Sequence, residues 1–360
     1  MNTNLLAAAL IALSIVTTNA QTTMNNPNTN KSLAPFQQLE LTAEWDKVFP
    51  KSDKVNHQKV TFVNRYGITL AADMFTPKNV SGKLPAIAVS GPFGAVKEQS
   101  SGLYAQQLAE RGFLTIAFDP SFTGESGGMP RRVASPDINV EDFSAAVDFL
   151  SVQPNVDPER IGILGICGWG GIAIQAAIND TRIKATVAST MYDMTRVNAN
   201  GYFDGENTPE QRNAKRKAMA ARRTEDYRNS AYTRGGGVVD PVPDDAPQFV
   251  KDYHAYYIEP RGFHPRSGNS TDGWNVTSAL PVVNFKFFEY AEELENAVMI
   301  VHGEKAHSRY FGEDTFKRLR GSNKELLIVA DANHVDLYDN LGKIPMNQIA
   351  EFYTTWMPAK

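Results

Sequence analysis

The sequence predicts an α/β protein with a mostly parallel, doubly wound sheet and an inserted cap. Short and nearly continuous apolar runs recur along the chain, which is typical of strands covered on both faces. These runs lie at residues 84–91, 113–120, 161–167, 183–190, 297–304 and 324–331. Helical periods separate several of them, and this alternation indicates parallel strands joined by crossover helices.

A hairpin precedes the parallel strands, and one long insertion interrupts them. Two β-rich runs, 59–66 and 68–75, flank Gly67, so we expect an antiparallel hairpin there. The interval 196–294 breaks the alternation, because its first half is rich in glycine and arginine and its second half in aromatic residues. We interpret this interval as a cap and not as a second sheet unit.

Two of the crossover helices have recognisable ends. The segment 100–112 has a helical period and closes with Gly112 just past its last turn. The segment 139–153 opens with Asn139, a residue type that caps helix N-termini. We therefore expect helices over these two ranges.

The chain begins with a segment that predicts export. An apolar run over residues 5–16 is followed by small residues up to Ala20, so residues 1–20 are predicted to be a signal peptide cleaved after Ala20, with the periplasm as the destination. The run is shorter than the roughly 20 residues that span a bilayer, and no later segment qualifies, so we expect no stable membrane insertion after cleavage. Because no Lys or Arg precedes the run, an uncleaved anchor is the alternative.

The residues after the signal divide into a leader and one domain. Residues 21–45 are rich in Asn, Thr and Ser, which predicts a flexible leader, and residues 46–360 form the predicted domain. The 42% hydrophobic content of the whole chain allows a large core. With 36 basic and 40 acidic residues the chain lacks the positive charge that nucleic acid requires, so we expect no nucleic-acid partner. The sequence carries no signal for the oligomeric state.

The strongest chemical signal is the only cysteine, Cys167, which follows an apolar run and precedes a glycine-rich helix start in "GICGWGG". A nucleophile on such a strand–turn–helix is held in strained geometry, with its side chain in the cleft. The helix N-terminus is expected to lower the pKa of the thiol. The alternative is that Cys167 is a small buried residue that fills a tight turn.

Three other residues lie after strands at the same predicted sheet edge. His334 follows the last apolar run and is the candidate general base, with an ordinary surface histidine as the alternative. An oxyanion hole needs two N–H donors, and Gly168 and Phe93 are the candidates, since Pro92 has no N–H. The alternative for the segment around Phe93 is an ordinary Gly-Pro turn.

These residues together resemble the α/β-hydrolase superfamily, and a cysteine in place of serine in "GICGWGG" is similar to dienelactone hydrolases. The resemblance covers about residues 59–358, least well in the cap. It implies an α/β-hydrolase fold, with Cys167 as nucleophile, His334 as general base, and Gly168 and Phe93 as oxyanion donors. It also implies hydrolysis of an ester, lactone or thioester in a small-molecule acyl substrate, without a metal or other cofactor.

The sequence departs from the pattern of that superfamily at two points of the site. The glycine pair Gly170–Gly171 arrives one position late after the cysteine, and Ala306 occupies the place where the superfamily usually has the acid that orients the histidine. Asp193, just past a predicted strand, is our first candidate for that acid, and Glu304 is the second. Each of these carboxylates could instead cap a helix or bond within a loop.

Two alternative functions follow from these departures and from the cap. An acyltransferase would form the same acyl-enzyme on Cys167 and pass it to an alcohol or amine, as an aromatic cap that excludes water would favour. A non-catalytic protein of this fold would only bind ligands in the cleft, which the missing acid at Ala306 and the shifted glycines allow.

Overall fold

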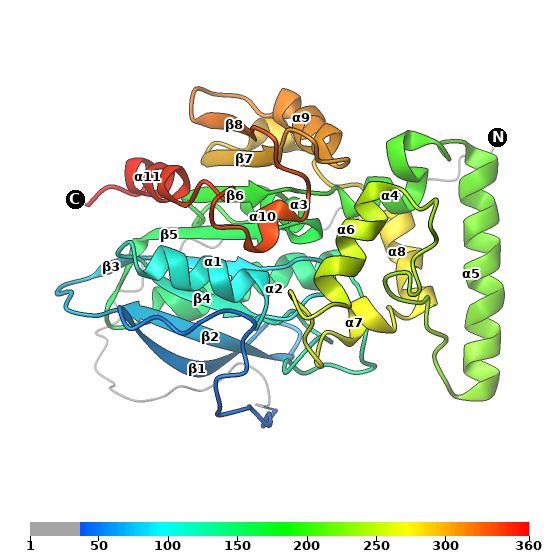
Figure 1. The fold of residues 1–360 in the computed structure, drawn as a ribbon, viewed down its shortest axis with the longest axis horizontal. Helices are drawn as coiled ribbons and strands as arrows, with labels where there is room; N and C mark the ends of the chain where they lie inside the picture. The colour runs from blue at the N-terminus through cyan, green and yellow to red at the C-terminus, as the bar shows by residue number, and fades with distance from the viewer. Residues whose placement is uncertain (1–36, 360) are drawn as a thin grey trace, which may run out of the picture. The chain divides into compact units, whose positions relative to one another are not determined.

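A computed structural model describes residues 37–359, which contain one eight-stranded sheet with the order β1-β2-β4-β3-β5-β6-β7-β8 (Figure 1). The strands are β1 Val55–Val63, β2 Thr69–Pro77, β3 Leu84–Ser90, β4 Leu114–Phe118, β5 Val156–Ile166, β6 Ala185–Ser189, β7 Ala297–Gly303 and β8 Lys324–Val329. The pairs β1–β2 and β2–β4 are antiparallel and the other five are parallel. The predicted mostly parallel sheet is therefore confirmed.

The predicted hairpin is formed by β1 and β2, whose register pairs Val63 with Thr69. The Asn64 N–H donates to the Ile68 carbonyl at 3.0 Å and closes the turn. Gly67 has φ 79°, a left-handed conformation that favours glycine. The hairpin lies at the edge of the sheet, away from the strand ends that carry the site residues.

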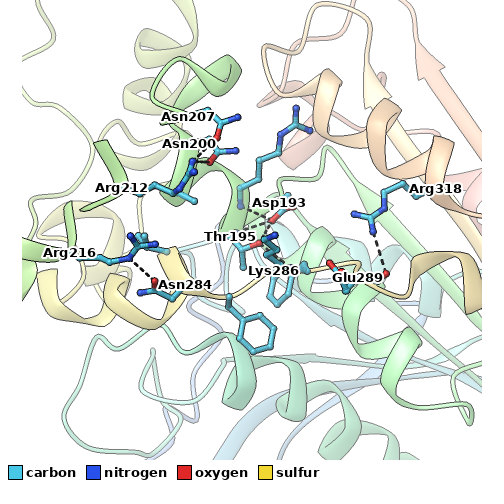
Figure 2. Close-up of a pocket in the computed structure, with 15 residues that line it drawn as sticks. Asp193, Thr195, Asn200, Asn207, Arg212, Arg216, Asn284, Lys286, Glu289 and Arg318 are labelled. Carbon is cyan, nitrogen blue, oxygen red and sulfur yellow. Dashed lines mark hydrogen bonds between the residues drawn. The ribbon is translucent and has the colours of Figure 1, made fainter. Parts of the chain in front are cut away.

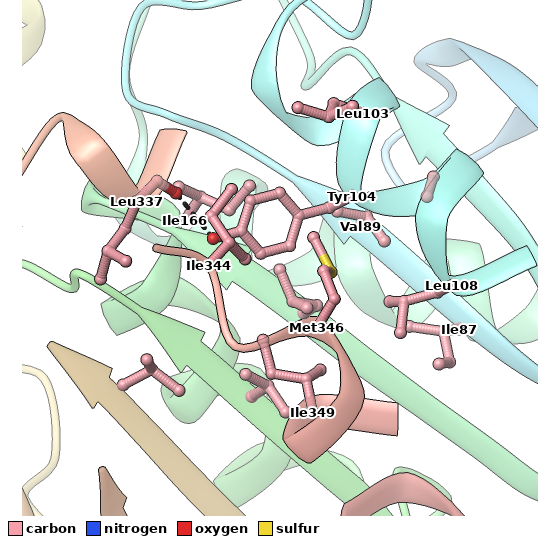
Figure 3. Packing of buried hydrophobic residues seen from close by; sticks show 14 of the residues in the cluster. Ile87, Val89, Leu103, Tyr104, Leu108, Ile166, Leu337, Ile344, Met346 and Ile349 are labelled. Carbon is pink, nitrogen blue, oxygen red and sulfur yellow. Dashed lines mark hydrogen bonds between the residues drawn. The ribbon is translucent and has the colours of Figure 1, made fainter. Parts of the chain in front are cut away.

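Helices cover both faces of the sheet. On one face lie α1 Ser100–Ala109, α10 Asp336–Asp339 and α11 Met346–Trp356, and on the other α2 Pro136–Ser151 and α3 Gly168–Asn179. Helix α9, Arg309–Arg318, connects β7 to β8. Figure 3 shows Tyr104, Ile166 and Met346 packed together on the first face. Burying an aliphatic side chain of this kind stabilises the fold by about 1.5–3 kcal/mol, so these interfaces hold the strand ends in place.

Helix α2 begins earlier than its sequence suggests. The structure starts it at Pro136, with the Ser135 hydroxyl accepting from the Ile138 N–H, so the predicted start at Asn139 is wrong. Ser at the cap followed by Pro at the first position is a stronger start signal than a later Asn. The Asn139 side chain instead accepts a hydrogen bond from the Ser135 N–H at 2.9 Å.

The predicted signal peptide and residues 21–36 of the predicted leader lie outside the described residues, so both stay predictions. The remainder of that leader range contacts the domain. The Gln37 N–H donates to Thr69 Oγ1 at 3.0 Å and the Thr42 N–H to Glu125 Oε1 at 2.7 Å. Trp45 packs edge-on against Phe49, with ring centroids 5.7 Å apart.

The chain leaves the sheet between β6 and β7, where the sequence predicts the cap. This part contains the helices α4 Met194–Asn200, α5 Pro209–Asn229, α6 Gln248–Tyr257, α7 Gly268–Thr271 and α8 Ala279–Asn284. Short 3₁₀ turns lie at Tyr202–Asp204, Val276–Ser278 and Ala291–Glu293. In Figure 1 these helices lie together at one end of the sheet, with the long α5 outermost. Across residues 37–359 we find no helix that is both long and apolar enough to cross a membrane.

Candidate active site

Cys167 lies on a strained turn between β5 and α3, with φ 57° and ψ −126°. A positive φ is costly for a residue with a Cβ, so the surrounding structure must hold it. The Cys167 N–H donates to the Ser189 carbonyl, and the Cys167 carbonyl accepts from the N–H groups of Gly170 and Tyr192, each at 2.9 Å. These three hydrogen bonds fix both peptide groups of the residue that carries the sulfur.

The glycines around the cysteine are required by close backbone approaches. A Cβ on Gly165 would lie 2.0 Å from the Trp169 carbonyl oxygen, so only glycine fits two residues before the cysteine. A Cβ on Gly171 would lie 2.2 Å from the Tyr192 carbonyl oxygen. The late glycine pair therefore lets α3 pass close to the loop after β6, and it is compatible with Cys167 at the turn.

The sulfur of Cys167 lies among three hydrogen-bonding groups but is largely shielded from water. Burial raises the pKa of the thiol, although the Tyr338 phenol and the N–H groups of Phe93 and Gly168 act in the opposite direction. The expected lowering of this pKa by the helix N-terminus is therefore wrong for the resting site, because desolvation is the larger effect. Phe93 and Gly168, the two predicted oxyanion donors, thus both present an N–H group to the sulfur, and their oxyanion role stays a prediction.

The loop that carries Phe93 is held by the cap and by its own turn. The Phe93 ring stacks on Trp274, with centroids 4.4 Å apart. The Ala95 N–H donates to the Pro92 carbonyl at 3.0 Å. Gly94 has φ 93°, and a Cβ there would lie 2.9 Å from Ser270 Oγ. The Phe93 N–H is thus positioned by both the sheet domain and the cap.

The His334 imidazole is buried and uncharged. Burial holds its pKa well below the ordinary value, and the neighbouring His307 and His302 lower it further. Its Nδ1 lies 2.6 Å from Ser308 Oγ and 2.9 Å from Thr190 Oγ1. A neutral imidazole can accept a proton at one nitrogen while the other is oriented by these hydroxyls.

Tyr338 connects the histidine to the cysteine. Its hydroxyl lies 3.0 Å from His334 Nε2, and Tyr338 and Cys167 line the same cavity, where the phenol lowers the pKa of the thiol. Burial holds the pKa of the Tyr338 phenol well above its ordinary value, so the phenol is neutral and can donate one proton while it accepts another. The phenol is therefore hydrogen-bonded to the imidazole and lies on the cavity wall that also carries the sulfur.

The structure places the two candidate acids away from His334. Asp193 Oδ1 caps helix α4 by accepting from the N–H groups of Thr195 and Arg196, each at 2.9 Å. Glu304 Oε2 accepts from the Asp331 N–H at 2.9 Å. Within residues 37–359 neither carboxylate hydrogen-bonds to His334, whose Nδ1 bonds to hydroxyl groups only.

Sequence reasoning missed Ser308 and Tyr338. Ser308 lies two residues past Ala306, the place where an acid was sought, and its buried hydroxyl reaches the same imidazole nitrogen that an acid would. Tyr338 lies in the short helix α10, which begins two residues after His334, and this turn of helix brings its hydroxyl back to the imidazole. A helical prediction after His334 would have been the signal for Tyr338.

A cavity of about 260 Å³ opens onto the sulfur. Its walls come from the sheet domain and from the cap, and none of the lining side chains of the described chain carries a formal charge. The lining residues are Phe93, Cys167, Tyr192, Met194, Val197, Tyr202, Gly236, Gly237, Val238, Tyr253, Tyr257, Asn269, Ser270, Trp274 and Tyr338. Five phenols among them give the cavity aromatic walls with a few hydrogen-bonding groups.

His307 does not line this cavity but contacts Tyr192, which does. Its Nε2 hydrogen-bonds with the Tyr192 hydroxyl, and its ring stacks on Phe249 of helix α6 with centroids 4.2 Å apart. Burial lowers its pKa to about 4. His307 therefore stays neutral near pH 7 and links the cap helix to the wall of the site. Across the described residues no group of three or more His, Cys, Asp or Glu side chains is placed to hold a metal ion.

The sheet order and the strand–turn–helix at the cysteine define the class of fold, which is the α/β-hydrolase fold. Residues 66–336 match the family model described as X-Pro dipeptidyl-peptidase (S15 family), and the chain belongs to this family. The family match spans the sheet from β2 onward, the cap, and both Cys167 and His334. The finer likeness to dienelactone hydrolases is not shown by these matches.

Related proteins extend the comparison over almost the whole chain. An uncharacterised Pseudomonas aeruginosa protein, PA2218, is 54% identical over 352 residues, which cover 97% of this chain and 92% of that protein. Its crystal structure has a TM-score of 0.86 and covers 89% of this chain and 99% of its own. YcjY of Escherichia coli strain K12 is 36% identical over 79% of this chain and 93% of its own.

Two fungal proteins are similar over less of the chain or at lower identity. Thiohydrolase aneE of Aspergillus aculeatus is 34% identical over 137 residues, which cover 38% of this chain and 42% of that protein. The α/β hydrolase GrgF of a Penicillium species has a TM-score of 0.70 at 20% identity, over 84% of this chain and all of its own, which shows the fold.

Proposed function

We propose that the protein hydrolyses ester, lactone or thioester bonds of a small acyl substrate through an acyl-enzyme on Cys167. The observation that carries this proposal is the position of the sulfur. It lies on a strained turn, beside the N–H groups of Phe93 and Gly168, and at the wall of an uncharged cavity. A cysteine that only filled space would need neither the strain nor the two converging donors.

The first step is transfer of the thiol proton as sulfur attacks the carbonyl carbon. The thiol proton passes to the Tyr338 oxygen while the Tyr338 proton passes to His334 Nε2, so the phenol ends unchanged and the imidazole becomes an imidazolium. The sulfur forms a bond to carbon, and the carbonyl electron pair moves to oxygen. The N–H groups of Phe93 and Gly168 stabilise the resulting oxyanion.

The second half of the reaction returns the site to its starting state. The tetrahedral intermediate expels the alcohol or thiol, which takes the proton from His334 through the Tyr338 hydroxyl. Water then gives a proton to the imidazole by the same route as its oxygen attacks the acyl carbon, and the carbon–sulfur bond of the new tetrahedral intermediate breaks to release the acid. The proton returns from His334 through the Tyr338 hydroxyl to the sulfur, which restores the Cys167 thiol and the neutral imidazole. Ser308 and Thr190 hold the ring through Nδ1 during both steps.

The walls of the cavity favour a neutral and partly apolar acyl group. Tyr192, Tyr253 and Tyr257 present aromatic surface, which buries apolar area, and their hydroxyls can bond a carbonyl or hydroxyl of the substrate. The name of the fungal relative, thiohydrolase aneE, is consistent with a thioester as substrate. A thioester also suits this site because its thiol leaving group needs little protonation.

A peptidase activity, which the family description names, is not favoured by this cavity. A dipeptidyl-peptidase must bind the positively charged amino terminus of a peptide, and a carboxylate is the usual partner for an ammonium in a partly buried site. The described residues that line the cavity include no Asp or Glu. An amide leaving group would also need stronger protonation than a thiol.

Acyl transfer to an alcohol or amine is a second candidate. The aromatic cavity limits the water available to hydrolyse the acyl-enzyme, and two fungal relatives are named polyketide transferase and acyltransferase. Product analysis with added alcohols separates the two reactions. An ester formed in preference to the acid would assign the protein to the transferases.

Acylation of the single cysteine tests the proposal directly. The wild-type protein is mixed with p-nitrophenyl butyrate and with a butyryl thioester, and the intact mass and the Cys167 peptide are measured. We expect a butyryl adduct on Cys167 and turnover that Cys167→Ala abolishes. A fully active Cys167→Ala would remove the cysteine from the mechanism, and a wild-type protein with neither adduct nor turnover across a panel of acyl esters would favour a ligand-binding role.

A further inference from the structure

A second cavity, of about 480 Å³, lies between helices α4, α5 and α8 and the end of α9 (Figure 2). Helix α4 separates it from the Cys167 cavity. Asp193, Thr195 and Arg196 line the new cavity, whereas Met194 and Val197 line the other. The two cavities share no lining residue among those that the structure describes, so the new cavity is a separate site.

The new cavity is rich in positive charge. Five basic side chains and two acidic ones line it, which gives a formal excess of three positive charges, in a chain whose formal net charge is −4. The basic residues are Arg196, Arg212, Arg216, Lys286 and Arg318, and the acidic ones are Asp193 and Glu289. The local charge is therefore opposite in sign to that of the protein as a whole.

One basic and one acidic residue of this set already have strong partners within the protein. Arg196 forms ion pairs with Asp204 at 2.5 Å and with Asp314 at 3.0 Å, so its charge is compensated. The Asp193 carboxylate accepts from the N–H groups at the start of α4, which stabilise it. Neither group has a free charge to offer to the cavity.

The other four cations have only neutral partners in the described chain. Arg212 Nη1 donates to the side-chain oxygen of Asn207 at 2.6 Å, and Arg216 Nε donates to that of Asn284 at 2.8 Å. Arg318 donates to the backbone carbonyl of Glu289 at 3.5 Å. Within the described residues none of Arg212, Arg216, Lys286 and Arg318 forms an ion pair with a carboxylate, unlike the half-buried Arg261 and Arg266 elsewhere in the chain.

The arrangement of these cations matches a ligand with two acidic groups. Figure 2 shows Arg212 and Arg216 on one side of the cavity, Arg318 on the opposite side, and Lys286 between them. A guanidinium presents a planar fork that binds two phosphate oxygens at once. Cations on opposite sides of a cavity of this size can each hold one acidic group, and an anion there would also relieve their mutual repulsion.

We propose that this cavity binds a small phosphorylated compound that carries at least two acidic groups, such as a pyrophosphate. Binding is independent of the acyl chemistry at Cys167, because α4 stands between the two sites. The residues that bind are Arg212 and Arg216 from α5, Lys286 from the loop after α8, and Arg318 from α9.

Calorimetric titration with pyrophosphate tests this assignment. The pocket variant is the double substitution Arg212→Gln and Arg216→Gln. Its control is Lys217→Gln with Arg228→Gln, which removes the same charge from exposed positions of the same helix outside the cavity. We expect saturable binding that weakens at least tenfold in the pocket variant and less than twofold in the control.

Three results would overturn the proposal. They are the absence of saturable binding, an equal loss in the pocket and control variants, and citrate binding as tightly as pyrophosphate, which would exclude a phosphate preference. Circular dichroism establishes whether each variant is folded. If the double variant Arg212→Gln and Arg216→Gln does not fold, Arg318→Gln replaces it and tests the opposite side of the cavity. Cys167→Ala should bind pyrophosphate as the wild type does, so the result does not depend on the proposed acyl chemistry.

Discussion

The imidazole Nε2 of His334 lies 3.0 Å from the hydroxyl oxygen of Tyr338, and Tyr338 lines the same cavity as the Cys167 thiol. In the proposed mechanism this phenol carries the proton from sulfur to nitrogen. Tyr338 would then act in the proton transfer as well as forming part of the cavity wall. This relationship makes the role of the hydroxyl testable by a one-atom change.

Tyr338→Phe should lower kcat by about 10²–10⁴-fold, the usual contribution of a positioned proton-transfer group, with a smaller change in KM. The ring would still fill its place, but no hydroxyl would join Cys167 to His334. Steady-state kinetics on a butyryl ester measures the effect. Tyr353→Phe is the control, because it also removes a buried hydroxyl, which donates to the Ile163 carbonyl remote from the site. An unchanged kcat in Tyr338→Phe would mean that Cys167 and His334 exchange the proton directly.

The Ser308 hydroxyl is expected to orient the His334 imidazole, as a carboxylate does in related sites. Ser308→Ala removes the 2.6 Å contact to His334 Nδ1 and leaves only Thr190 to orient the ring. The loss of one such hydrogen bond, about 1.4–3 kcal/mol, corresponds to a fall in kcat of about 10–100-fold. Asp193→Asn and Glu304→Gln should each change kcat less than Ser308→Ala does. A larger loss in either carboxylate variant would restore an acid to the site.

Much of this site could be predicted because strand ends in a parallel sheet meet at one edge. Cys167, Phe93 and His334 each follow a strand, and the glycines around Cys167 report close backbone approaches that only glycine allows. These features are set by residues that are close together in the chain, so they can be predicted from a single sequence.

The remaining parts depend on side-chain directions that one sequence does not contain. Asp193 lies at the correct sheet edge, but its carboxylate turns back to cap helix α4. Ser308 takes the position of an acid without resembling one, and Tyr338 reaches the site only because α10 begins just after His334. The pKa of Cys167 depends on how deeply the cap buries it, and no local pattern reports that burial.

The raised pKa of the Cys167 thiol predicts the pH dependence of its alkylation. Only the thiolate reacts, and burial favours the protonated form, so at pH 7 iodoacetamide should modify Cys167 more slowly than it modifies glutathione. The rate should increase as pH rises and continue to increase above the pH at which glutathione reaches its plateau. Intact mass spectrometry measures one modification, because Cys167 is the only cysteine. Equal rates at pH 6 and pH 9 would indicate a thiolate already formed at low pH.

Gly165→Ala should distort the turn that carries the nucleophile. The new methyl group would lie 2.0 Å from the Trp169 carbonyl oxygen, so the backbone of the turn must move. Overpacking of this kind costs about 1–3 kcal/mol of unfolding free energy, and the displaced sulfur should lower turnover further. Urea unfolding and ester hydrolysis measure the two effects. Gly235→Ala is the matched control, because its methyl group would make only ordinary contacts at 3.5 Å or more, and similar losses in both variants would contradict the steric argument.

Lys97 is expected to hold the loop that carries Phe93. Its side chain is fully buried, and its Nζ lies 2.8 Å from Asp119 and 2.7 Å from Glu98. Burial alone would lower the pKa of Lys97, but Asp119 and Glu98 outweigh it and hold the pKa well above the ordinary value, so the group stays charged. The Lys97 N–H also donates to Asp119 Oδ1 at 2.8 Å, which ties the loop to the end of β4.

Lys97→Met removes this charge and leaves the buried Asp119 carboxylate without an ion-pair partner among the described residues, whereas Glu98 keeps Arg266. Breaking a buried ion pair in this way costs about 3–5 kcal/mol of unfolding free energy, and movement of the Phe93 N–H should reduce kcat as well. Lys54→Met is the control, since the Lys54 side chain is 71% exposed and its pair with Glu110 is 3.7 Å long. A surface pair contributes about 0–1 kcal/mol, so the control should unfold at nearly the wild-type urea concentration. If Lys97→Met matched the control in both unfolding and kcat, the buried charges would not be what positions the oxyanion loop.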